Sequence, residues 1–270
     1  NNDTYLGVGD VSSKPLSDVI GRFYPQHFEL AASGVQNSCR TSTDANQHFS
    51  YMSESKLGLN YQVLARGLAG NTLENYHSGS YADTAQLLLV AQHNTQRLDA
   101  SRLEVDAGQW LQGIYSVEQT DAAFKRSVTP DGPYTNLQLG LQVLAGTERD
   151  NRNFQAFTLG TDAVALNGEV NIRYGRLALQ NGAGPEEEPL PLVFRTEYWN
   201  GSAFVPNLAD SCTIISASAS VLNTVGGSPD LTLAGVDSSL LDGSLPAGPI
   251  WLSPLTSPVP GVWRVEYQTQ

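Results

Sequence analysis

Apolar and polar residues alternate along many short stretches of this 270-residue chain. Alternation with a period of two places successive side chains on opposite faces of a β-strand. We therefore predict half-buried strands at His27–Ala31, Phe49–Met52, Leu57–Ala65, Gln112–Val117, Leu137–Val143, Val170–Tyr174, Val193–Trp199 and Val262–Tyr267. Helical periodicity is weak by comparison, so the pattern favours a chain built from strands.

Turn-forming residues separate the predicted strands. Gly, Pro, Asn and Asp supply the backbone angles of turns, and they gather at Ala69–Asn71, Thr129–Pro133, Asn167–Gly168, Asn200–Gly201 and Val225–Gly227. Many short strands joined by such turns are typical of an all-β fold. We predict two tandem immunoglobulin-like antiparallel β-sandwiches.

A charged stretch at 146–153 divides the chain into two parts of sandwich size. Residues 1–20 are then expected to be a linker or the trailing strand of a preceding domain. The first sandwich is expected at 21–150, and the second, which carries the sequence YWNG, at 151–270. Because Asn1 is not an initiator methionine and no signal peptide is recognisable, we expect a mature chain or an excised fragment.

The clearest local motif is a hairpin around Asn200 and Gly201. Asn-Gly is the preferred pair for a two-residue type I′ turn, which needs two positive φ angles. Such a turn would place Trp199 opposite Ser202 and Glu197 opposite Phe204.

Charge and composition exclude several classes of partner. The net charge is −12 and only 16% of residues are charged, whereas nucleic-acid binding needs clustered Lys and Arg. The same negative charge would be repelled by an anionic membrane surface. No apolar run reaches the roughly 20 residues that a membrane-spanning helix requires.

The sequence contains no recognisable catalytic or cofactor-binding motif, so we predict neither catalytic residues nor a cofactor. The four histidines, His27, His48, His77 and His93, lack metal-ligand spacing. Calcium could in principle use the oxygen-rich sites Asp150–Asn151 and Asp210, but their spacing does not support it, and no metal is predicted.

Two further residue types leave alternatives open. The tryptophans Trp110, Trp199, Trp251 and Trp263 could stack on sugars, although burial between sheets is the commoner role. Cys39 and Cys212 could form a structural disulfide or remain two buried thiols.

The run RYGRLALQNGAGPEEEPLPLVFRTEYWNGSAFVPNLADSCT, at residues 173–213, resembles the C-terminal region of the MshQ family, named for a protein of mannose-sensitive haemagglutinin pilus biogenesis. The segments GRFYPQHFEL, NSCRTSTDANQHFSYM and TPDGPYTNLQLGL fit the same family in order. That region is a domain of unknown function in large bacterial surface proteins. The first sandwich is also similar to the immunoglobulin-like repeats of bacterial adhesins.

The resemblance implies export to the cell surface and no catalytic residues. Export would take the chain through an oxidising compartment, where disulfides persist. Members of the family often carry a second cysteine pair that this chain lacks, so the resemblance implies a disulfide between Cys39 and Cys212.

These observations predict a non-enzymatic extracellular structural module of a large bacterial cell-surface or pilus-associated protein. Its expected partners are other domains or subunits of that assembly. The alternative is a glycan- or surface-binding module that uses exposed aromatics such as Tyr198 or Trp251. An enzyme on a sandwich scaffold is the third and weakest hypothesis.

Overall fold

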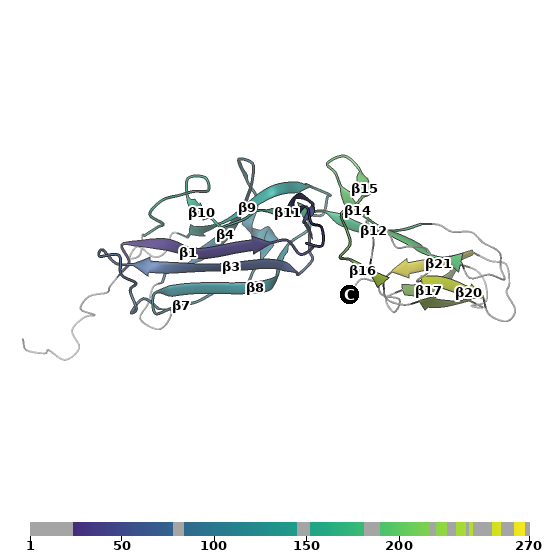
Figure 1. The fold of residues 1–270 in the computed structure, drawn as a ribbon, viewed down its shortest axis with the longest axis horizontal. Helices are drawn as coiled ribbons and strands as arrows, with labels where there is room; N and C mark the ends of the chain where they lie inside the picture. Colours follow the sequence, from purple (N-terminus) through teal and green to yellow (C-terminus); the bar gives the residue numbers. More distant parts are fainter. Residues whose placement is uncertain are drawn as a thin grey trace, which may run out of the picture.

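The computed structural model describes residues 24–77, 84–144, 152–180 and 190–215, and beyond them the strands at 220–225, 231–235, 238–239, 250–254 and 262–267. These residues form two β units that lie end to end along the long axis (Figure 1). Nearly all the strand pairs are antiparallel, so the predicted all-β class is confirmed. We find no helix in these ranges with the length and apolarity of a membrane span.

The first unit is a sandwich of two sheets. One sheet has the order β1 (His27–Gln36), β3 (Leu57–Arg66), β8 (Ile114–Phe124) and β6 (Leu103–Glu104), with β7 (Trp110–Leu111) also on β8. The other has the order β2 (Ser50–Tyr51), β11 (Val170–Arg173), β9 (Tyr134–Val143), β4 (Leu87–His93) and β5 (Gln96–Arg97), with β10 (Ala163–Ala165) also on β9.

The order of these strands is that of an immunoglobulin sandwich. In that fold, strands A, B, E and D form one sheet and strands C, F and G the other. The first sheet has β1, β3, β8 and β6 in the places of A, B, E and D, and the second has β4, β9 and β11 in those of C, F and G. The short strand β2 runs parallel to β11, the only parallel pair of named strands in the described ranges.

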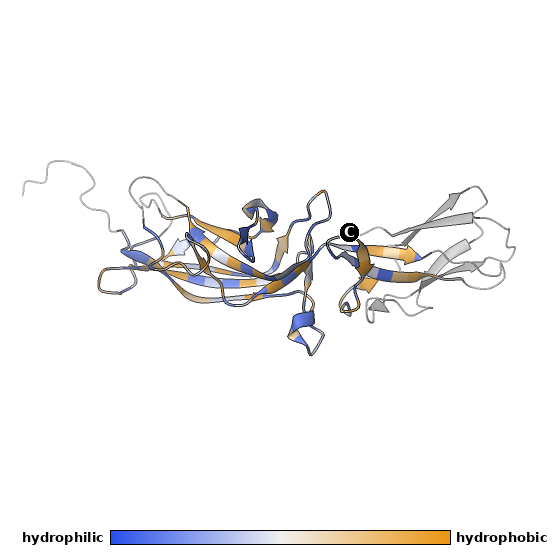
Figure 2. Cartoon of the chain, turned by 90° about the horizontal axis from the view of Figure 1, so that it is seen from above, coloured by the Kyte–Doolittle hydropathy of each residue, from blue (hydrophilic) through white to orange (hydrophobic). Residues whose placement is uncertain are grey.

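Alternating side chains fill the space between the two sheets. Hydrophobic and hydrophilic residues alternate along the strands of this unit in Figure 2. Along β3 every second residue is buried, and Val63 and Ala65 are fully enclosed. Trp110 packs on Phe28 with ring centroids 5.2 Å apart, and its indole N–H donates to the Ala85 carbonyl oxygen at 2.8 Å. Trp110 is therefore a core residue, and its burial removes apolar surface from water.

Two 3₁₀ turns are the only helical pieces in the described ranges. They are η2 (Ala45–Gln47) and η3 (Ala100–Arg102), and an aspartate caps each one: Asp44 accepts from the Asn46 N–H and Asp99 from the Ser101 N–H. Aspartate is a preferred residue at such a position because its oxygen satisfies an otherwise unpaired backbone donor.

The first unit continues to Arg173, so the expected division at residue 150 lies inside it. Both β10 and β11 pair with β9, in the sheet of the first unit. Asn153 also accepts a backbone hydrogen bond from Phe28 at 3.0 Å. The charged stretch that suggested a boundary connects two strands of one sheet, and its residues 146–151 lie outside the described ranges.

The second unit begins with a three-stranded sheet of β12 (Gly175–Gln180), β14 (Val193–Trp199) and β15 (Phe204–Pro206). Its other strands pair as β13 (Leu190–Pro191), β20 (Ile250–Pro254) and β18 (Leu231–Gly235) in one sheet, β16 (Ile214–Ile215) with β19 (Ser238–Ser239), and β17 (Ser220–Val225) with β21 (Val262–Tyr267). All of these pairs are antiparallel.

Candidate functional site at the junction of the two units

The chain passes from the first unit to the second with only Tyr174 between β11 and β12. Tyr174 is buried in the core of the first unit, and its carbonyl oxygen accepts from the Trp199 N–H of β14 at 2.9 Å. The Arg126 guanidinium lies 4.1 Å from the centre of the Tyr174 ring and donates to the Gly175 carbonyl oxygen at 2.9 Å. The connection is therefore part of the packed structure, with no linker at this crossing.

A buried polar network joins the two units beside this crossing. The Tyr51 hydroxyl, on β2, donates to an Asp210 carboxylate oxygen at 2.9 Å and accepts from the Asn207 side chain. Arg173 donates to the side-chain oxygen of Asn207. Asp210 and Asn207 have no exposed surface. Buried polar groups must be hydrogen-bonded to avoid a large desolvation cost, so this network favours one arrangement of the two units.

Burial changes the acidity of the groups in this network. It raises the pKa of the Tyr51 hydroxyl, and the neighbouring Asp210 carboxylate raises it further. Burial also lowers the pKa of the Arg173 guanidinium. The Tyr51 hydroxyl therefore keeps its proton and can act as the donor to Asp210.

The Arg173 side chain also joins aromatic rings from both units. Its guanidinium carbon lies 4.5 Å from the centre of the Phe49 ring in the first unit and 4.7 Å from that of Tyr198 in β14. Cation–π contacts of this kind are attractive, and more so where water is excluded. Tyr198 therefore packs against Arg173, a role that differs from the sugar platform of the alternative hypothesis.

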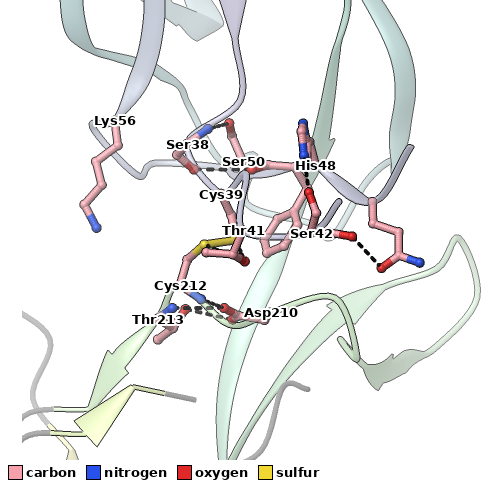
Figure 3. Close-up of a disulfide and its surroundings, with 12 residues drawn as sticks. Ser38, Cys39, Thr41, Ser42, His48, Ser50, Lys56, Asp210, Cys212 and Thr213 are labelled. Atoms are coloured by element: carbon pink, nitrogen blue, oxygen red, sulfur yellow. Dashed lines mark hydrogen bonds between the residues drawn. A yellow bond between two sulfur atoms is a disulfide. The ribbon is translucent and has the colours of Figure 1, made fainter. Parts of the chain in front are cut away.

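A disulfide between Cys39 and Cys212 closes the same junction (Figure 3). The sulfur atoms are 2.02 Å apart, and the bond joins residues 173 positions apart in the sequence. Cys39 precedes β2 in the first unit, and Cys212 precedes β16 in the second. The structure thus contains the pairing that the family resemblance implied.

Two protein-family models match the chain along the same division. The model described as DUF6701, third domain, matches residues 1–171, and that described as DUF6701, fourth domain, matches residues 173–258. The chain belongs to the DUF6701 family. The third domain corresponds to the first β unit and the fourth domain to the second, and the matches meet next to Tyr174. No curated protein and no solved structure matches the chain.

The fourth DUF6701 domain contains a buried carboxylate next to the junction. The Glu197 side chain in β14 is 3% exposed and pairs with Arg176 at 2.6 Å and with Arg195 at 2.7 Å. The two arginines are half-exposed, and Arg176 also lies 3.9 Å from the centre of the Phe204 ring. The charge of Glu197 is thus compensated inside the sheet β12–β14–β15.

The hairpin between β14 and β15 differs from the predicted two-residue turn, and that prediction is wrong. Trp199 pairs with Phe204 and Glu197 with Pro206, so the loop contains the four residues 200–203. The Asn200 side-chain oxygen accepts from the Ser202 and Ala203 N–H groups at 3.0 and 2.9 Å. These bonds stabilise a wider loop in which Gly201, at φ +102°, has the positive φ and Asn200 does not.

Replacing Gly201 by valine should lower the free energy of unfolding by about 1 kcal/mol or more, because a β-branched residue resists positive φ. Space is not the obstacle, since an added Cβ would meet only the Gly132 carbonyl oxygen, at 3.8 Å. Chemical denaturation of Gly201→Val against the unchanged chain measures the loss. The control Gly201→Asn should lower the free energy of unfolding by less, because asparagine tolerates positive φ better than valine. Equal decreases in the two variants would contradict this explanation.

The loop that approaches Gly201 from the third domain is anchored by Asp131. Its carboxylate accepts from Arg102, from the Tyr134 hydroxyl at 2.6 Å and from the Ser127 hydroxyl at 2.7 Å. Burial alone would raise the pKa of Asp131, but these hydrogen bonds outweigh it and the pKa is lowered. The loop therefore depends on an ionised Asp131.

Acid should remove the contribution of Asp131 to stability. Because its pKa is lower in the folded state than in the unfolded chain, the contribution is complete above the unfolded value of about 3.9 and disappears as pH falls through the folded value. We expect Asp131→Asn to be less stable than the unchanged chain at pH 7 and to approach it at pH 3. Denaturant unfolding at both pH values checks this, and a difference independent of pH would contradict it.

The candidate metal residues of the sequence do not come together in the described ranges, where no group of three His, Cys, Asp or Glu side chains could hold an ion. His48 contacts the Ser42 carbonyl oxygen at 2.9 Å, and the His93 ring packs against that of Tyr134. Asp210 uses its oxygens to accept from Tyr51, Cys212 and Thr213. The other calcium candidate, Asp150–Asn151, and the Trp251 and Trp263 side chains lie outside the described residues.

Two grooves in the described part of the third domain lie away from the junction. One, of about 280 Å³, crosses the outer face of β3 and β8, lined by Ala32, Asn60, Tyr61, Gln62, Ser116, Val117 and Glu118. The other, of about 140 Å³, is lined mainly by apolar residues of β4 and of the segment at 100–107. The disulfide and the buried hydrogen-bond network both lie at the junction of the two domains. We therefore take the junction, and not either groove, as the candidate functional site.

Sequence reasoning found only part of this site. It singled out the two cysteines, and it considered Asp210 only as a calcium candidate, which the residue spacing did not support. It missed Tyr51 and Arg173, because no local motif marks them and Tyr51 lies 159 positions from its partner Asp210. The polar run between Pro206 and Cys212, which ends the hairpin, is the one signal that could have pointed to a structured loop.

Proposed function

We propose that this chain is a non-enzymatic structural module of a large bacterial cell-surface or pilus-associated protein. In this role the two DUF6701 domains hold a fixed spacing and orientation between the parts on either side of them. The partners are other domains or subunits of the same assembly, and the wider protein is of the MshQ type that residues 173–213 resemble.

The observation that carries this proposal is the construction of the junction. Two domains usually move relative to each other unless their interface is extensive. Here the Tyr174 connection, the Tyr51–Asp210 hydrogen bond and the Cys39–Cys212 disulfide all oppose bending between them. A fixed angle is of use to a spacer, whereas a binding module needs only its own binding surface to be ordered.

Two other features support an exported location and a non-catalytic role. Structural disulfides persist in oxidising compartments and are rare in the cytosol, so the bond between Cys39 and Cys212 favours an exported chain. The ionisable groups buried at the junction are engaged with one another, as Tyr51 is with Asp210 and Glu197 is with two arginines. These side chains serve the packing of the two domains.

The proposal is tested by small-angle X-ray scattering of the oxidised chain together with a glycan array. We expect scattering that one fixed arrangement of the two domains reproduces, and no glycan bound. Scattering that requires a broad range of interdomain angles would exclude the spacer role. Specific glycan binding with a fixed junction would instead favour the alternative, a recognition module.

A further inference from the structure

Cys39 is held in place by the third domain. It exchanges two backbone hydrogen bonds with Phe49, at 2.9 and 3.1 Å, and the preceding Ser38 N–H donates to the Ser50 hydroxyl at 2.8 Å. Cys39 is also buried, with 4% of its surface exposed. The segment at Phe49–Tyr51 therefore fixes the position of this sulfur atom without any contribution from the disulfide.

Cys212 is held in place by Asp210. One carboxylate oxygen of Asp210 accepts from the Cys212 and Thr213 N–H groups, at 3.0 and 2.9 Å. The other accepts from the Thr213 hydroxyl at 2.7 Å and, across the junction, from the Tyr51 hydroxyl at 2.9 Å. Figure 3 shows Asp210 beside the backbone of this turn, with Cys212 directed at Cys39.

Both cysteines are thus aligned by the same short strand. In β2 and the residue before it, Phe49 holds Cys39 directly, and Tyr51, two residues further, holds Cys212 through Asp210. We propose that Tyr51 and Asp210 are positioning residues for the oxidation of Cys39 and Cys212. Their hydrogen bond docks the third and fourth DUF6701 domains while both thiols are still reduced, and the docking brings the two sulfur atoms together.

The oxidation requires an external oxidant, which we take to be a small disulfide. The half-buried Cys212 thiolate attacks the oxidant, forms a mixed disulfide and releases one thiol. The buried Cys39 thiolate then attacks the Cys212 sulfur atom, and the second half of the oxidant leaves as a thiol. Two protein thiols are oxidised and one small disulfide is reduced. The Thr41 hydroxyl, 3.6 Å from the Cys212 sulfur and 3.8 Å from that of Cys39, can donate to either thiolate.

The variant Tyr51→Phe tests the proposal, because it removes the hydroxyl and keeps the ring that packs on Phe49. The reduced chain is mixed with oxidised glutathione and alkylated at intervals, and mass spectrometry then counts dithiol, mixed disulfide and closed disulfide. We expect mixed-disulfide formation at the rate of the unchanged chain and closure slowed about tenfold or more, as for the loss of a hydrogen bond to a charged group.

The matched control is Thr213→Val, which removes a donor to the same Asp210 oxygen from within the turn and leaves the bond across the junction. Closure in this control should proceed much faster than in Tyr51→Phe. An unchanged closure rate in Tyr51→Phe, or equal slowing in both variants, would overturn the proposal. If circular dichroism shows that reduced Tyr51→Phe is unfolded, Asp210→Asn provides a second comparison. Its amide keeps one acceptor oxygen for the Cys212 and Thr213 N–H groups and places an NH2 group, which cannot accept, toward the Tyr51 hydroxyl.

Discussion

Replacing both cysteines, in the variant Cys39→Ser/Cys212→Ser, should lower the free energy of unfolding by about 3–5 kcal/mol. The bond closes a loop between residues 173 positions apart, and closing so long a loop removes much of the conformational freedom of the unfolded chain. Denaturant unfolding of the variant and of the oxidised chain, at the same pH, measures the difference.

The unchanged chain in the presence of a reductant is the control for this variant. It should unfold at the same denaturant concentration as Cys39→Ser/Cys212→Ser, because both lack the bond and differ only at two small side chains. Equal midpoints for the oxidised and the variant chain would mean that the bond contributes nothing to stability.

Removing both partners of Glu197, in Arg176→Met/Arg195→Met, should destabilise the fourth domain by about 3 kcal/mol or more. The Glu197 side chain is 3% exposed, so its carboxylate would be left buried without a compensating charge. Methionine keeps much of the apolar length of arginine, which limits the loss of packing against Phe204. Denaturant unfolding at neutral pH measures the effect.

Adding Glu197→Met to that double variant should restore most of the lost stability. The triple variant has an apolar residue where the unpaired charge was, and buried ion pairs can be replaced by apolar groups at little cost. If the triple variant were as unstable as Arg176→Met/Arg195→Met, the loss would come from the packing of the arginine stems and not from the buried charge.

The strands of this protein could be predicted from the sequence because their signal is local. The predicted range Val193–Trp199 is β14, and Leu57–Ala65 lies within β3 with its alternate residues buried. Alternation reports which face of a strand is buried, and this does not depend on distant parts of the chain. The terminal prediction Val262–Tyr267 likewise coincides with β21.

The turn at Asn200 and the domain boundary could not be predicted in the same way. The Asn200 side chain makes bonds within the loop that favour four residues, whereas the Asn-Gly preference describes only the backbone angles. The boundary was misplaced because a charged, strand-free stretch is a common linker, whereas here β10 and β11 return to the sheet of the first unit. Pairing between distant strands decides the boundary.

The junction network was beyond sequence reasoning for a related reason. Tyr51, Arg173 and Asp210 are each unremarkable in their own segments, and they form a site only because the fold brings three distant segments to one place. The cysteines were easier, since two residues allow only one intramolecular pair.

The covalent ring closed by Cys39 and Cys212 determines how the chain would respond to tension. A force applied between the two ends of the described chain, at residues 24 and 267, is transmitted through the disulfide and bypasses the residues between the cysteines. Even after both domains lose their structure, that loop of 173 positions cannot be drawn out. At roughly 3.3–3.6 Å per extended residue, the loop has a length of about 600 Å, which the disulfide prevents from being extended. Reduction of one bond would release that length, so under tension the bond sets how far the chain can be stretched.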